Sequence, residues 1–444
     1  MMKCGFGRAD ITPRIGVELC GFGPFLNRHS IGVRDRLWAR ALALEVAGSK
    51  LLLVSCDLIG IDLKTTSLVR ALVKEKTGWP EDAIMIHCTH THSGPATIDL
   101  IGWGQPDPVY REILPYRVTE ACFQAVKNLI VASLAYREVE CPGIGQNREY
   151  DRDALPLEEV LKPDWRPARP DLTDTTCHVF VFQKDNTILG FLSYFGCHPV
   201  VCCSQTRWIH GDYCGIATNQ VERDFPGSTG LFLQGALGDV NTCVVHKPEQ
   251  ESLLALDEIA GRYARVLRRG LAEALPVKVD TLKVVRKKVK FLRQHWSVQE
   301  IKKRCRQQEK ILHGPGASDG DKNVRMAMVY LLALRQMLEA RKTALCLQPE
   351  TEIQGFRLGS FLFLAAPFEI FQAIKNDVRD YFQSQKTLVM SLTNDCLGYA
   401  PDRTAEKRGG YAAQAVPLIL GSLPFRKIHQ QLVKQLISLG EDLR

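Results

Sequence analysis

The sequence predicts an α/β fold in which mixed β-sheets form the core and helices pack on the outside. Short apolar runs typical of buried strands recur along the chain, and stretches with the period of amphipathic helices lie between them. The same pattern is present near both ends, and no repeat or clear linker separates them. We therefore expect residues 1–444 to form one large domain rather than two.

In the first part of the chain, apolar spacing predicts a hairpin, two helices and a buried strand. Residues 39–46 and 51–56 are apolar and flank a turn, which is typical of a β-hairpin. Apolar side chains at helical spacing predict a helix over 63–76 and a long helix over 107–134. Between these helices, the apolar run at 83–86 predicts a short buried strand.

The rest of the chain alternates in the same way. Residues 141–175 are rich in Pro, Asp and Arg and predict an extended loop, long enough to be functional. Two charged helical stretches flank a Gly-Pro turn and predict a helical hairpin insertion at about 297–343. Apolar runs predict strands at 177–195, 231–234, 361–366 and 387–392, and helical spacing predicts helices at 213–223, 250–275 and 425–439.

The bulk composition, 45% hydrophobic and 24% charged, is that of an ordinary globular protein. The formal charge is +8, and its densest basic run, at 286–290, is interpreted as a solvated face rather than a nucleic-acid surface. The N-terminus lacks a signal-like apolar segment, and no charge-free apolar run of about 18 residues is present. The fifteen scattered cysteines predict reduced, buried thiols. We therefore expect a cytoplasmic protein without stable membrane insertion or a nucleic-acid partner.

The most informative segment is His-Cys-Thr-His-Thr-His-Ser-Gly-Pro at 87–95, which follows a predicted strand and ends in a chain break. On an extended chain His90 and His92 leave the same face, whereas His87 points elsewhere. Two convergent imidazoles can bind one metal ion, or one can bind the metal while the other contacts a substrate. An isolated His-x-His has too few fixed positions to exclude histidines that only cap the loop.

Other predicted strands also end in a polar group beside a chain break. Catalytic zinc takes nitrogen and oxygen ligands and keeps one position open. Two histidines, a carboxylate and a further oxygen from different strands would satisfy that requirement. The residues at these strand ends are His90, His92, His198, Asp239, Asn241, Glu369 and, shortly after a strand, Tyr399.

Taken together and in order, these motifs resemble the neutral/alkaline non-lysosomal ceramidase family. That family comprises zinc amide hydrolases that act on an N-acyl linkage, and the resemblance implies the mixed-sheet fold of its N-terminal catalytic domain. The opening segments Gly-Phe-Gly-Arg-Ala-Asp-Ile-Thr-Pro and Val-Arg-Asp-Arg-Leu-Trp-Ala-Arg-Ala resemble it too. The motifs that carry the resemblance are those at 5–13, 33–41, 89–95, 196–199, 235–241 and 394–399.

The resemblance implies a role for each matching position. Its implied zinc ligands are His90, His198, Glu369 and Tyr399. Its implied substrate-contacting residues are His92, which contacts the substrate carbonyl, Arg148, Tyr411 and Asn241.

The chain departs from the family pattern in three respects. Asn241 stands where the family has a serine, and Phe368 stands where it usually has glycine. We also expect no C-terminal immunoglobulin-like domain and no secretion signal. The sequence thus predicts a zinc-dependent amidohydrolase that cleaves a linear N-acyl bond of a small or lipid-like substrate with metal-activated water. The alternatives are an esterase, lactonase or phosphoester hydrolase on the same zinc site, or a metal-binding module without catalysis.

Overall fold

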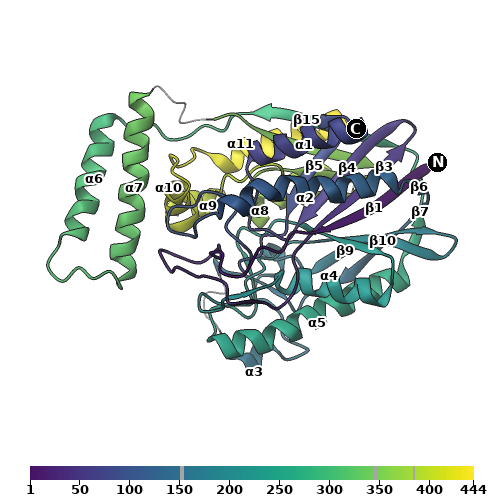
Figure 1. The fold of residues 1–444 in the computed structure, drawn as a ribbon, viewed down its shortest axis with the longest axis horizontal. Helices are drawn as coiled ribbons and strands as arrows, with labels where there is room; N and C mark the ends of the chain where they lie inside the picture. Colours follow the sequence, from purple (N-terminus) through teal and green to yellow (C-terminus); the bar gives the residue numbers. More distant parts are fainter. Residues whose placement is uncertain (151–154, 344–348, 384–385) are drawn as a thin grey trace.

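The computed structural model describes residues 1–150, 155–343, 349–383 and 386–444. Within these ranges the strands form three large sheets whose inner faces share one apolar core (Figure 1). The first sheet has the order β5-β4-β3-β1-β6 and is mixed, because β4 pairs in parallel with β5 and antiparallel with β3. Its strands are β1 (Met2–Asp10), β3 (Trp38–Val46), β4 (Ser49–Cys56), β5 (Ile84–Cys88) and β6 (Ile130–Val131).

The other two large sheets are also mixed. The second has the order β12-β10-β9-β7-β14, with only β10 and β12 parallel, and the third has the order β15-β16-β17-β19, with β17 and β19 parallel. The second contains β7 (Ser133–Glu140), β9 (Thr176–Lys184), β10 (Thr187–Phe195), β12 (Thr229–Gln234) and β14 (Leu275–Val277). The third contains β15 (Leu282–Val289), β16 (Thr351–Leu358), β17 (Phe361–Ala365) and β19 (Lys386–Met390).

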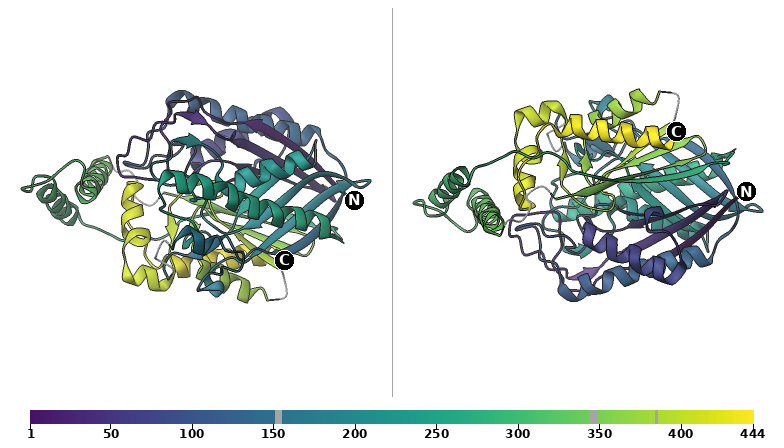
Figure 2. Two further views of the ribbon diagram at one scale, coloured as in Figure 1. Left: turned by 90° about the horizontal axis from the view of Figure 1, so that it is seen from below. Right: turned by 90° about the horizontal axis from the view of Figure 1, so that it is seen from above.

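Helices cover the outer face of each large sheet (Figure 2). Leu51 and Leu53 of β4 face the shared core, whereas Leu52 and Val54 face the helices, as strand geometry requires. Burial on both faces explains why such strands are continuous apolar runs. The covering pairs are α1 (Leu63–Thr77) with α2 (Pro108–Lys127), α4 (Asp212–Asp224) with α5 (Glu249–Glu273), and α8 (Gln372–Tyr381) with α11 (Ile428–Leu443).

Smaller elements lie between the sheets, and two helices extend away from them. Helices α6 (Val298–Leu312) and α7 (Lys322–Lys342) pack along each other and project from the body, as expected for a helical hairpin (Figure 1). The short strand pairs are β2 (Gly32–Val33) with β11 (Trp208–Ile209), β8 (Gly145–Asn147) with β13 (Val240–Thr242), and β18 (Glu369–Ile370) with β20 (Tyr399–Ala400). The remaining turns are α3 (Leu157–Val160), α9 (Arg403–Arg408), α10 (Val416–Ile419), 3-10 turns at Glu81–Ala83 and Pro170–Leu172, and a π-helical turn at Tyr411–Ala415.

The predicted helix over 107–134 is wrong at its C-terminal end. The helix stops at Lys127, and the chain then forms β6 and β7, because the apolar residues beyond it pair with the first and second sheets. The predicted loop at 141–175 is largely irregular, but it contains β8 and two short helical turns, and its residues 151–154 lie outside the described ranges.

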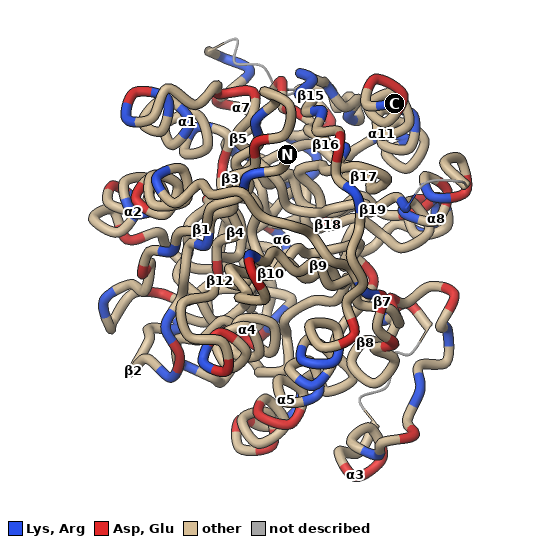
Figure 3. The backbone as a smooth tube through the Cα atoms, turned by 90° about the vertical axis from the view of Figure 1, so that its right-hand side faces the viewer, with Lys and Arg blue, Asp and Glu red and all other residues tan. Residues whose placement is uncertain are grey.

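Residues 286–289 of the basic run lie in β15, which was not among the strands predicted from apolar runs, and Lys290 follows it. Three of its four cations form ion pairs: Arg286 with Asp82 and Glu352, Lys287 with Asp442 at 2.5 Å, and Lys288 with Glu350 at 3.6 Å. Basic and acidic residues are interspersed along the backbone around the periphery of the molecule (Figure 3). These pairs agree with the interpretation of the run as a solvated face.

The cysteines of the described ranges are all free thiols, and all but Cys396 are buried, as expected. Cys346 lies outside those ranges. Among the described helices, none is long and apolar enough to cross a bilayer.

Candidate active site

The predicted site residues come together at the ends of strands from all three large sheets. His90 follows β5, and His198 follows β10. Glu369 and Tyr399 begin β18 and β20, and they are direct partners in that parallel pair. The backbone N–H of His198 donates to the carbonyl of Val240 at 2.9 Å, which fixes the segment after β10 against β13. The topology thus brings together residues that are up to about 300 positions apart.

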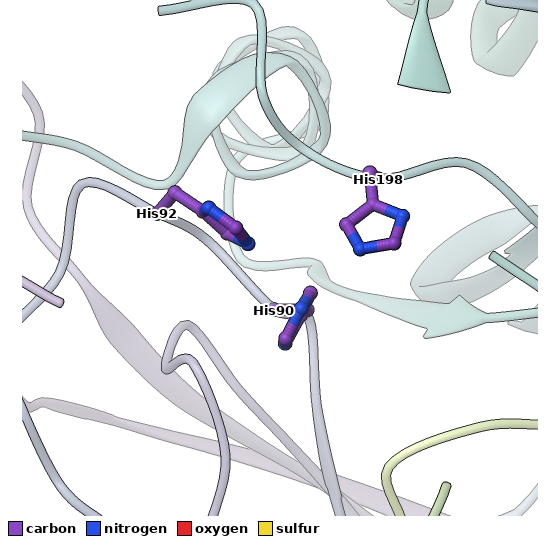
Figure 4. Close-up of side chains that lie close together, drawn as sticks. All are labelled: His90, His92 and His198. Carbon is purple, nitrogen blue, oxygen red and sulfur yellow. The ribbon is translucent and has the colours of Figure 1, made fainter. Parts of the chain in front are cut away.

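Three imidazoles converge at the centre of the site (Figure 4). One ring nitrogen from each of His90, His92 and His198 lies within 4.8 Å of the others, and the ring centroids are 4.9 to 5.9 Å apart. The Nδ1–H of His90 donates to the Ile59 carbonyl at 2.6 Å, and that of His198 donates to the Leu237 carbonyl at 2.6 Å. Both rings therefore turn an Nε2 lone pair toward the centre.

Glu369 places a third acceptor between these two rings. Its Oε2 atom lies 2.9 Å from His198 Nε2 and 3.3 Å from His90 Nε2. Burial raises its pKa, but the neighbouring imidazoles outweigh this and hold the pKa of Glu369 well below its usual range. Burial also lowers the pKa of His198 to about 4, although the hydrogen bond to Glu369 opposes this. The Glu369 carboxylate oxygen and the Nε2 atoms of His90 and His198 thus converge on one point, and such a set of one oxygen and two nitrogens is a suitable environment for a cation.

Tyr399 completes an oxygen-and-nitrogen donor set around this centre. Its hydroxyl lies 3.3 Å from His198 Nε2. Burial raises the pKa of Tyr399 well above its ordinary value, so the hydroxyl is protonated in the absence of a metal. The set of two imidazoles, one carboxylate and one phenol matches the nitrogen and oxygen ligands that zinc prefers.

His92 differs from the other two histidines. In the part of the chain that is described, neither of its buried ring nitrogens has a hydrogen-bond partner. Burial and the neighbouring imidazoles lower its pKa well below the ordinary value, so the ring is neutral. Two features hold it: Arg28 donates to its backbone carbonyl at 3.2 Å, and Gly21 packs so closely that a Cβ there would overlap the ring. His92 can therefore provide a third metal-binding nitrogen or a hydrogen bond to a substrate.

A cavity of about 940 Å³ opens from this centre, and the predicted substrate-contacting residues His92, Arg148, Asn241 and Tyr411 all line it. The Arg148 guanidinium lies 4.9 Å from the ring centroid of Tyr399, and the rings of Tyr399 and Tyr411 are 6.0 Å apart. Asn241 reaches the cavity wall because its strand, β13, pairs with β8, which ends just before Arg148. All eight residues predicted for the site therefore lie at or around it.

Gly21 had no predicted role in this geometry, Asp239 was predicted only as a polar group at a strand end, and Phe368 lies in the core. Gly21, which belongs to a Gly-Phe-Gly segment, has a positive φ of 105° and leaves room for His92. Asp239 accepts hydrogen bonds from Asn147 and from the Gln372 backbone at 2.9 and 2.8 Å, and burial raises its pKa to about 7. Phe368 is fully buried against other aromatic rings in the core.

Comparisons with known proteins agree with this architecture. Residues 2–245, more than half of the chain, match the family model described as neutral/alkaline non-lysosomal ceramidase, N-terminal. The neutral ceramidase of Pseudomonas aeruginosa is 28% identical over 263 residues, which cover 55% of this chain and 38% of that enzyme. The chain therefore matches well under two thirds of that relative's length.

Two solved structures show the same fold over the whole chain. A crystal structure of neutral ceramidase from Pseudomonas aeruginosa superimposes with a TM-score of 0.73 at 20% identity, covering 100% of this chain and 75% of that one. A ceramidase structure described as complexed with C2 gives a TM-score of 0.74 at 19% identity, covering 100% and 76%. With the family match over residues 2–245, the chain belongs to the neutral/alkaline non-lysosomal ceramidase family.

Proposed function

We propose that this protein is a zinc-dependent hydrolase that cleaves an N-acyl amide bond. The observation that carries the proposal is the convergence of His90 Nε2, His198 Nε2 and Glu369 Oε2 beside a cavity of about 940 Å³. Family membership supports the same reaction class. The presence of His92 and Arg148 in the cavity wall favours catalysis over a purely structural metal site.

His90, His198, Glu369 and Tyr399 would hold the metal ion. The converging acceptors fit a divalent cation, and the carbonyl acceptors behind both imidazoles would fix their orientation. When bound, zinc lowers the pKa of a coordinated water to about 7 and polarises a carbonyl group.

The protein's own residues orient the substrate and transfer protons. His92 and Tyr411 would donate hydrogen bonds to the carbonyl oxygen, where negative charge develops, and such preorganised donors contribute about 3–4 kcal/mol each in other hydrolases. Glu369 or a neighbouring group would accept a proton from the attacking water. Arg148 and Asn241 would orient the polar part of the substrate from the cavity wall.

We propose that the substrate is smaller and more polar than long-chain ceramide. Asn241 has a carboxamide where the family has a serine hydroxyl, so it can donate and accept hydrogen bonds but is a poor nucleophile. Much of the cavity wall is polar or charged, with Gln146, Arg148 and Gln308 among its residues. The cytoplasmic location expected from the sequence stays a prediction.

Metal analysis of purified protein, made without added metal, tests the site. We expect about one zinc ion per chain, as one tetrahedral or five-coordinate site requires. His90→Ala and His198→Ala should lose the metal, whereas His92→Ala should retain it and lose turnover. His313→Ala, which changes an exposed histidine at the end of α6, is the matched control. Absence of zinc, with no activity gained on adding it, would refute the metal assignment. If His92→Ala loses as much zinc as His90→Ala, then His90 and His92 both bind the ion.

A substrate panel tests the bond and the substrate. N-acyl compounds that vary in chain length and amine should be cleaved when the acyl group is short and the amine polar, and matched esters serve to detect the esterase alternative. Efficient cleavage of long-chain ceramide, with short polar amides untouched, would restore an ordinary ceramidase assignment.

A further inference from the structure

Two spaces of different size and polarity meet at the histidine cluster. Beside His90, His92 and Glu369 lies a pocket of about 40 Å³, which shares His92, Tyr399 and Tyr411 with the wall of the large cavity. Apolar side chains contribute much of its wall: Ile59, Ile98, Leu100, Val416, Ile419 and Leu420. A water-sized position needs about 10–15 Å³ on this measure, so the pocket holds roughly three such positions.

This difference in size orients the substrate, if the protein cleaves an N-acyl bond as proposed. A short acyl group of two or three carbon atoms fits the small apolar pocket. A polar amine portion would lose its hydration there without recovering hydrogen bonds, which is costly. The amine portion must therefore lie in the 940 Å³ cavity.

The wall of this large cavity carries an excess of positive charge. Arg148, Arg304, Lys322 and Arg408 line it, whereas Glu149 is the only acidic residue among the described residues of its wall. Glu149 forms an ion pair with Arg408, so these two charges offset each other.

The hairpin α6–α7 supplies half of these cations. Arg304 pairs with Glu300 at 3.0 Å and lies 4.0 Å from the centroid of the Trp296 ring, so its position is fixed. Lys322 lies in the first turn of α7, and over the described ranges it has no carboxylate within 4.0 Å.

Lys322, Arg148 and His246 all line the large cavity. Arg148, from the body of the protein, likewise has no carboxylate within 4.0 Å among the residues that are described. Partial burial lowers the pKa of His246, and the positive charges of Lys322 and Arg148 lower it further, which agrees with all three lying along one wall. A cleft lined by one sign of charge focuses its potential and attracts a group of the opposite sign.

We propose that Lys322 and Arg148 form a subsite for an anionic group on the amine portion of the substrate. The substrate class is then a short-chain N-acyl compound whose amine portion bears a carboxylate or a phosphate. Lys322 determines specificity from the hairpin, and Arg148 lies closer to the reacting bond. This inference rests on the proposed function for the orientation of the substrate.

Matched probes that differ only in charge test the subsite. These are 6-acetamidohexanoate, 6-acetamidohexyl phosphate and the neutral 6-acetamidohexan-1-ol, assayed with zinc-loaded full-length protein. At low salt kcat/KM should be about tenfold higher for at least one anionic probe than for the alcohol, and the difference should shrink at high salt. The two anionic arms distinguish a carboxylate from a phosphate. Equal kcat/KM on all three probes would overturn the proposal.

Charge reversal assigns the effect to the hairpin. Lys322→Glu should abolish the preference for the anion, measured as the ratio of kcat/KM for the anionic probe to kcat/KM for the alcohol. Lys302→Glu makes the same charge change on exposed surface of α6, outside the cavity wall, and should retain the preference. A preference retained in Lys322→Glu, or lost equally in both variants, would refute a local subsite.

A binding measurement separates this inference from the reaction itself. The ketone 8-oxononanoate is a non-hydrolysable analogue of the carboxylate probe, and 9-hydroxynonan-2-one is its neutral counterpart. Measured by calorimetry, Lys322→Glu should bind 8-oxononanoate about fivefold more weakly than the wild type does, and its affinity for 9-hydroxynonan-2-one should be unchanged. If no amide probe is hydrolysed, the proposed function fails while calorimetry still decides the subsite; unchanged affinity for 8-oxononanoate would refute it.

Discussion

His87 begins the histidine run but lies in the core, and its environment predicts a measurable effect of pH on folding. The side chain is fully buried. Its Nδ1–H donates to the Ser391 carbonyl at 3.0 Å, and its Nε2 accepts the backbone N–H of Gln234 at 2.8 Å. Only the neutral ring can make both bonds, and burial lowers the pKa of His87 to about 3 from 6.5.

The direction and size of the effect follow from this difference in pKa. Above pH 6.5 both the folded and the unfolded chain hold a neutral ring, so the stabilisation is fully present. As the pH falls from 6.5 toward 3, the unfolded chain binds a proton and the folded chain does not, so stability is lost. At about 1.36 kcal/mol per pH unit, His87 should cost about 2 kcal/mol of unfolding free energy at pH 5 relative to pH 8.

Urea denaturation of wild type and His87→Gln at pH 8 and pH 5 measures this cost. The variant should begin about 1–2 kcal/mol less stable, because one buried hydrogen bond is lost. Its loss of stability between the two pH values should be smaller than that of wild type by about 2 kcal/mol. The other buried histidines contribute equally to the pH dependence of the unfolding free energy in both proteins, so their contributions cancel. His29→Gln, at an exposed position, is the control. Equal losses in wild type and His87→Gln would refute the reasoning.

Three further substitutions test the site. Gly21→Ala should push the His92 ring aside and lower kcat/KM about 100-fold while zinc content is retained. Gly48 also has a positive φ, 85°, but a Cβ there would meet no atom within 4 Å, so Gly48→Ala is the control; equal losses in both variants would mean that only backbone strain is measured. Asp239→Ala should cost about 1–3 kcal/mol of unfolding free energy for each buried donor that it strands, measured by urea denaturation, and an unchanged midpoint would contradict its anchoring role. Asn241→Ser should raise kcat/KM for long-chain ceramide relative to a short polar N-acyl substrate, and an unchanged ratio would remove Asn241 from substrate selection.

Much of the fold was predictable because each strand carries its own burial pattern. Leu51 to Val54 are apolar at every position because one face meets the shared core and the other meets helices. Edge strand β15 was missed because its exposed positions carry the basic run. The end of the helix over 107–134 was missed because Ile130 continues the helical spacing, although it pairs with β1.

The rings of His90 and His92 converge as predicted, but not for the reason that was predicted. His90 and His92 were expected to share a face of an extended chain. In the structure β5 ends at Cys88, and His90 has a positive φ of 74°. The two rings converge because the loop turns, not because a strand alternates. Periodicity also cannot identify groups contributed by distant segments, such as the Ile59 and Leu237 carbonyls behind the imidazoles.

The groups behind each imidazole support a division of roles within the histidine cluster. A metal-binding histidine is usually oriented by an acceptor on its other nitrogen, and His90 and His198 each have such a carbonyl acceptor at 2.6 Å. His92 has no such acceptor among the described residues and is oriented by packing, against Gly21 and 5.2 Å from the ring centroid of Phe22. Its nitrogens therefore remain available to a ligand that enters from the cavity. This asymmetry favours metal binding by His90 and His198 and substrate contact by His92, and it makes the zinc content of His92→Ala the decisive measurement.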